Sequence, residues 1–63
     1  MNRERLTEKL EPRYRETGFY LEDDEDFLYL EWGERVVAVW NAAGATLEAV
    51  QAEADRQMAE AHN

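Results

Sequence analysis

A tight turn at Gly33-Glu34 constrains the fold of this chain more than any other feature of its sequence. It separates residues 27–32 from residues 35–40, and both segments are rich in the aromatic and β-branched residues that favour strands. A two-residue loop that begins with glycine is typical of a primed hairpin turn, which needs a positive φ. The turn fixes the expected pairing of the two strands: Trp32 with Arg35, Leu30 with Val37 and Leu28 with Val39.

A third strand is predicted over residues 19–22, just before the acidic run of residues 22–26. With residues 23–26 as a four-residue loop, Leu21 pairs with Leu28. Side chains alternate along a strand, so this register sorts them onto two faces. The aliphatic face holds Phe19, Leu21, Leu28, Leu30, Val37 and Val39. The aromatic face holds Tyr20, Phe27, Tyr29, Ala38 and Trp40, with Glu22 and Glu31 at its edge.

Helices are predicted on either side of these strands. Residues 2–11 form the first, with Leu6 and Leu10 on one face, and Pro12 ends it because proline cannot continue a helix. Residues 46–61 form the second, which begins at a threonine N-cap and is rich in Ala, Glu and Gln. Its apolar stripe is expected to pack on the aliphatic face: Leu47, Val50, Ala54, Met58 and Ala61.

These elements predict a single α+β domain over residues 1–63. It consists of a helix, a three-stranded antiparallel β-meander, and a C-terminal helix packed on one sheet face. A chain of 63 residues buries a small core, so either very regular local packing or association with another chain is expected to stabilise it. The sequence has no cysteine, which excludes disulfides and cysteine-based metal sites. The only histidine, His62, suits the C-terminal end of a helix dipole better than a metal site.

Charge and hydropathy exclude several classes of partner. The net charge is −8, and the acidic residues dominate after residue 18, so the body repels phosphate groups and direct nucleic-acid binding is not expected. No segment approaches the roughly 20 apolar residues that span a bilayer. The N-terminus is charged and lacks the apolar region of a signal peptide. We therefore expect a cytoplasmic protein that does not bind membranes.

Catalysis is not expected from this sequence. It contains neither serine nor cysteine, and its three glycines are isolated rather than grouped in a phosphate-binding loop. Its many carboxylates have no predicted cleft in which their pKa values would shift. The sequence therefore predicts a non-enzymatic protein with no catalytic residue, cofactor or metal ligand. The acidic run 22–26 lacks the EF-hand pattern, which leaves two readings open: a solvated turn or a weak cation site.

The aromatic face is the candidate site. Either the N-terminal helix covers it with Leu6 and Leu10, or a partner does, because aromatic residues are favoured at protein interfaces. We expect a protein-interaction module that forms a homodimer through this face, although another protein partner is possible. The predicted interface residues are Tyr20, Phe27, Tyr29 and Trp40. The alternative is an acidic inhibitor or antitoxin-like protein that mimics nucleic acid and binds a basic groove on its partner.

Overall fold

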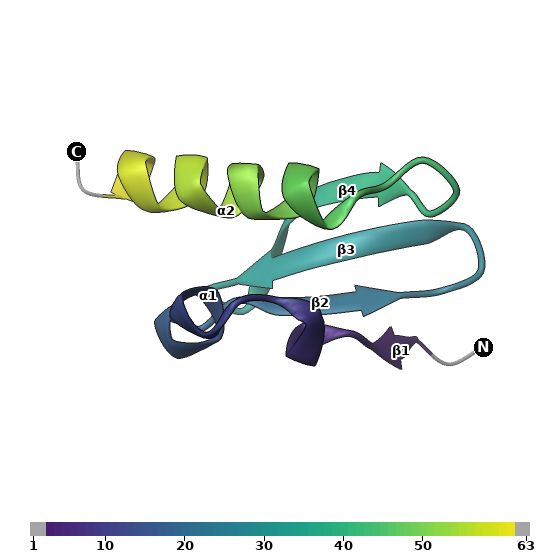
Figure 1. Ribbon diagram of the computed structural model, residues 1–63, viewed down its shortest axis with the longest axis horizontal. Coiled ribbons are helices and arrows are strands. Elements are labelled where there is room, and N and C mark those ends of the chain that lie inside the picture. The colour runs from purple at the N-terminus through teal and green to yellow at the C-terminus, as the bar shows by residue number, and fades with distance from the viewer. Residues whose placement is uncertain (1–2, 62–63) are drawn as a thin grey trace.

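The computed structural model describes residues 3–61, which form an elongated body of 36 × 20 × 19 Å (Figure 1). The elements along the chain are β1 (Glu4–Arg5), the short 3₁₀ helix η1 (Thr7–Lys9), α1 (Pro12–Thr17), β2 (Tyr20–Asp23), β3 (Phe27–Trp32), β4 (Arg35–Asn41) and α2 (Leu47–Ala61). The α+β class is confirmed. The sheet has four antiparallel strands in the order β1-β2-β3-β4, however, rather than the three predicted. Within residues 3–61, no helix has the length and apolar character needed to cross a bilayer.

The N-terminal segment does not form the single helix predicted over residues 2–11. Its β1 pairs with β2 at the edge of the sheet, and η1 follows. Pro12 begins α1 instead of ending a helix, and it occupies the first turn of α1. Proline is favoured there because the N–H that it lacks would have no partner within the helix.

Thr7 joins this segment to the sheet through two hydrogen bonds. Its buried hydroxyl accepts a hydrogen bond from the Leu21 N–H at 3.0 Å and donates to the Leu21 carbonyl at 3.3 Å. The Leu6 N–H donates to the same carbonyl at 2.7 Å. These bonds satisfy the buried backbone groups of β2 where β1 ends, so the chain can turn into η1 without leaving a buried polar group unpaired.

The β2–β3 turn is tighter than predicted. Leu21 pairs with Leu30 instead of Leu28, a shift of two residues along the partner strand. An even shift keeps every side chain on its predicted face. The Asp24 carboxylate explains the tighter turn, because its Oδ1 accepts hydrogen bonds from the N–H groups of Asp26 and Phe27, both at 2.8 Å. Aspartate stabilises such turns by replacing backbone partners in this way.

The β3–β4 hairpin begins in the predicted register. Trp32 pairs with Arg35 across the turn, where Gly33 and Glu34 have φ values of 64° and 65°. Two consecutive positive φ values define a type I′ turn, so the predicted primed turn is confirmed.

Beyond this turn, β4 contains a β-bulge that the sequence reasoning missed. Val37 is an extra residue in the ladder, and after it Leu30 pairs with Ala38 and Leu28 with Trp40. A single extra residue turns the rest of the strand over. The prediction that put Val39 on the aliphatic face and Trp40 on the aromatic face is therefore wrong. Trp40 packs against the core, and the exchange is favourable because tryptophan buries more apolar surface than valine.

Both helices cover the same face of the sheet, α2 on the β4 side and α1 on the β2 side (Figure 1). The Thr46 Oγ1 accepts a hydrogen bond from the Ala49 N–H at 3.1 Å, which confirms the predicted N-cap of α2. The Tyr14 hydroxyl of α1 donates to Asp55 of α2 at 2.9 Å. One buried cluster joins the helices to the sheet: Leu10, Tyr14, Phe19, Leu21, Leu28, Leu30, Val50 and Ala54.

This register makes a direct prediction about stability. Leu30 is fully buried at the centre of the sheet, whereas Val39 is half exposed. Leu30→Ala should lower the free energy of unfolding by about 2–5 kcal/mol through lost burial and a cavity. Val39→Ala, the matched control, should cost less than about 1 kcal/mol. Urea denaturation measures both values, and equal losses would contradict the assigned register.

Candidate functional site

The sheet face turned away from both helices, here called the outer face, carries the candidate site. The most exposed large apolar side chains on this face are between 42% and 50% exposed. Each of them alternates with buried residues along its strand or pairs with a residue that points outward. Strand pairing therefore places all of them on the outer face. They are Tyr20, Phe27, Val36 and Val39. The last three lie on β3 and β4 and are called the β4 strip.

The structure brings together three of the four predicted interface residues. Tyr20, Phe27 and Tyr29 all lie on the outer face, and the rings of Phe27 and Tyr29 are 6.4 Å apart. Trp40 lies on the opposite face, partly buried against the core. Val39 takes its place on the outer face, which sequence reasoning missed because alternation without a bulge puts Val39 inside.

The N-terminal segment does not cover the outer face with Leu6 and Leu10, as one of the two predictions had it. Leu10 is buried in the core and Leu6 packs against it, so neither leucine covers the outer face. Two arginines partly cover it instead. The guanidinium carbon of Arg3 lies 3.9 Å from the ring centroid of Tyr29, and that of Arg5 lies 5.5 Å from the ring of Tyr20. Both distances are within the range of a cation–π interaction.

Two carboxyl groups flank the Arg3 guanidinium. Its Nη1 lies 3.5 Å from Glu22 Oε1 on β2 and 3.8 Å from Glu31 Oε2 on β3. Glu31 Oε2 is buried and accepts no hydrogen bond within the described part of the chain. The hydrogen bond that a protonated Glu31 donates to Glu22 raises the pKa of Glu31, and burial and the charge of Glu22 raise it further. The same hydrogen bond, with the charge of Arg3, lowers the pKa of Glu22, so Glu31 is the member of the pair that keeps its proton to the higher pH.

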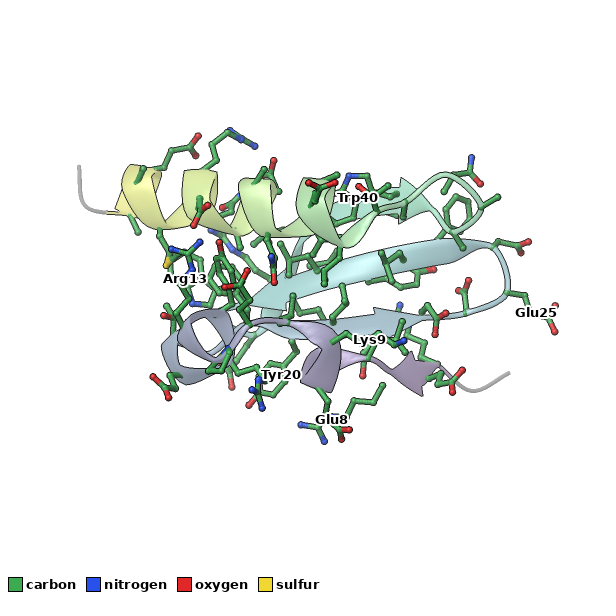
Figure 2. All side chains as sticks on the ribbon, viewed as in Figure 1. Glu8, Lys9, Arg13, Tyr20, Glu25 and Trp40 are labelled. Atoms are coloured by element: carbon green, nitrogen blue, oxygen red, sulfur yellow. The ribbon has the colours of Figure 1, made fainter. Side chains whose placement is uncertain are left out.

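The acidic turn is a hydrogen-bonded structure rather than a loose run of charges. The Tyr29 hydroxyl donates to Asp24 Oδ2 at 2.7 Å. This bond and the two backbone N–H bonds lower the pKa of Asp24, and the same bond raises the pKa of Tyr29. Glu25 points away from the body at the tip of the turn (Figure 2). Across residues 3–61, no group of three or more His, Cys, Asp or Glu side chains is placed to hold a metal ion.

An open depression of about 250 Å³ lies beside the bulge, between β4 and α2. Its lining consists of Arg35, Val36, Val37 and Gln57, which include no carboxylate or hydroxyl that could act as a base or a nucleophile. His62, predicted to suit the C-terminal end of a helix dipole, lies outside the described residues. No family model, curated protein or solved structure matches this chain. The outer face is therefore interpreted from its own geometry.

The carboxyl pair makes stability depend on pH. The folded chain holds the Glu31 proton to a higher pH than the unfolded chain does, so this stabilisation is lost as the pH rises through the folded pKa. Glu31→Gln keeps a hydrogen-bond donor at every pH. Its melting temperature should match that of the parent at about pH 4 and exceed it at about pH 7.

The matched control is Glu16→Gln, which removes one charge from an exposed position on α1. Thermal melts followed by circular dichroism at both pH values provide the comparison. If the two variants shift the melting temperature equally at neutral pH, the shift reflects net charge alone. That result would contradict the coupling between the Glu22 and Glu31 carboxyl groups.

Proposed function

We propose that this chain is a non-enzymatic protein-interaction module that forms a homodimer through the outer face of its sheet. One observation carries the proposal: both helices cover one sheet face, whereas the other leaves the β4 strip half exposed. Contiguous apolar patches are a feature of protein interaction sites, whereas apolar residues scattered singly are normal on a protein surface. The β4 strip also lies beside the free edge of β4, where no fifth strand pairs within residues 3–61.

A second copy of the chain fits this strip. Phe27 lies at one end, opposite Asn41, and Val36 lies at the other end, with Val39 between them. A twofold axis through Val39 therefore sets Phe27 of one copy against Val36 of the other, in a self-complementary contact. The exposed part of the strip amounts to roughly 200–300 Å² per copy, below the ~800 Å² of a standard interface. A weak, reversible dimer is the expected result.

The net charge of −8 opposes this association. The β4 strip itself carries no charge, and repulsion between distant charges is screened beyond about 8–10 Å at ordinary ionic strength. Association through the strip should therefore strengthen as salt is added.

The alternative is an acidic module that binds a basic groove on another protein. The observation in its favour is the set of exposed carboxylates on the β2–β3 turn and on α2, where the only cation is Arg56. That binding would weaken steeply with salt, because screening removes its main attraction. The sign of the salt dependence therefore separates the two proposals.

The dimer is tested by Val39→Lys, which places a charge in the middle of the strip. The matched control is Leu47→Lys, because Leu47 is 41% exposed but lies at the start of α2, away from the outer face. Sedimentation equilibrium over about 10 µM to 1 mM should show a parent that dimerises at high concentration. Val39→Lys should be monomeric and Leu47→Lys should dimerise like the parent.

A parent that keeps a mass of 7.4 kDa at the highest concentration would overturn the dimer proposal. Equal dimerisation of the two lysine variants would place the interface elsewhere on the molecule.

A further inference from the structure

The N-terminal strand binds the sheet as a short peptide would. Its two residues pair with the edge of β2, Glu4 with Asp23 and Arg5 with Glu22. Arg3 and Arg5 are two residues apart, so both side chains lie on the outer face. There Arg3 stacks on a tyrosine of β3 and Arg5 approaches a tyrosine of β2. This combination of backbone pairing and alternate side-chain contacts is how domains bind extended peptides by adding a strand.

The surface under these arginines has the chemistry of a guanidinium site. Tyrosine rings provide flat faces for stacking, and two carboxyl groups stand beside one of the rings. Arginine suits such a site better than lysine, because its planar group stacks and donates to two acceptors at once. We call this surface the arginine site: the edge of β2 with Tyr20, Glu22, Tyr29 and Glu31.

Arg3 fills the arginine site loosely. Its Nη1 is 3.5 Å from Glu22 and 3.8 Å from Glu31, whereas a strong bond between a guanidinium and a carboxylate is about 2.7–2.9 Å long. Glu31 Oε2 is buried and accepts no hydrogen bond from any described residue. A buried acceptor without a partner costs free energy, so binding of a group that donates a hydrogen bond to Glu31 Oε2 is favoured. The Arg3 side chain is also 43% exposed, so it is poorly enclosed.

We propose that the arginine site binds an extended Arg-X-Arg segment of a partner protein, and that the chain's own Arg3-Glu4-Arg5 occupies this site in the absence of the partner. The acidic body attracts such a basic segment. A partner segment replaces only β1, because Leu6 and Thr7 keep their own bonds to Leu21. The arginine site adjoins the β4 strip, since Tyr29 pairs with Val39 and Glu31 with Val36, but the two share no residue. Binding at the arginine site does not depend on the homodimer.

The test uses the full chain with Arg3→Ala and Arg5→Ala, and the peptide acetyl-Asn-Arg-Glu-Arg-Leu-amide as the probe. Isothermal titration should show at least about tenfold tighter binding to this variant than to the parent, whose tethered arginines compete with the peptide. Lys9→Ala with Arg35→Ala is the control: both residues are exposed and removing them changes the net charge equally. This control should bind the peptide no better than the parent.

Two further measurements test whether the site prefers arginine to lysine and whether it needs its two carboxyl groups. The peptide with both arginines replaced by lysine should bind the double alanine variant at least about fivefold more weakly. Adding Glu22→Gln and Glu31→Gln to that variant should abolish the gain. If circular dichroism shows that the double alanine variant is unfolded, Arg3→Ala alone is compared by the same criteria.

The proposal is overturned if the folded double alanine variant binds the peptide no more tightly than the parent does. It is also overturned if that variant binds the lysine peptide as tightly as the arginine peptide. Sedimentation of the parent is measured separately. A dimer without peptide binding would reject only the arginine site, and peptide binding by a monomeric parent would reject only the dimer.

Discussion

One extra residue in β4, Val37, turns the following residues of that strand over and so decides what each sheet face carries. The bulge leaves a local gap in the ladder, and a net backbone hydrogen bond contributes only about 0.5–1.5 kcal/mol. In return, the Trp40 ring moves against the core. In a regular strand Val39 would be buried in its place, so the gain is the difference in buried apolar area between the two side chains, at ~25 cal/mol per Å². Tryptophan offers more of this area than valine, which favours the bulged strand.

The difference between the residues on the two sheet faces follows from this bulge. The inner face gains a large aromatic residue, and both helices cover it, so no helix within residues 3–61 covers the outer face. Val39 joins Val36 on the outer face along β4, while the tyrosines and carboxyl groups lie nearer to β1. The apolar strip and the arginine site are therefore different halves of one uncovered surface, each suited to a different kind of contact.

Much of this architecture could be predicted from the sequence. The Gly33-Glu34 turn, the threonine N-cap of α2 and the α+β class follow from local chemistry, and an error of two residues in the β2–β3 register leaves the faces unchanged. The bulge could not be predicted, because it reflects competition between Val39 and Trp40 for the core. Pro12 alone does not say where a helix lies, because proline both ends helices and begins them, and here it begins α1. The spacing of Arg3 and Arg5 was a signal for a strand, but two residues are too few to establish one without the tyrosines beside them.

The bulge itself is tested most directly by nuclear Overhauser contacts from the side chains of Trp40 and Val39. The bulged register predicts contacts between the Trp40 indole and the Leu28 side chain, and between the Val39 methyl groups and the Tyr29 ring. Contacts of the Val39 methyl groups with Leu28, together with contacts of the indole with the Phe27 ring, would show a regular hairpin. That result would contradict the assignment of both faces and of the surfaces proposed on them.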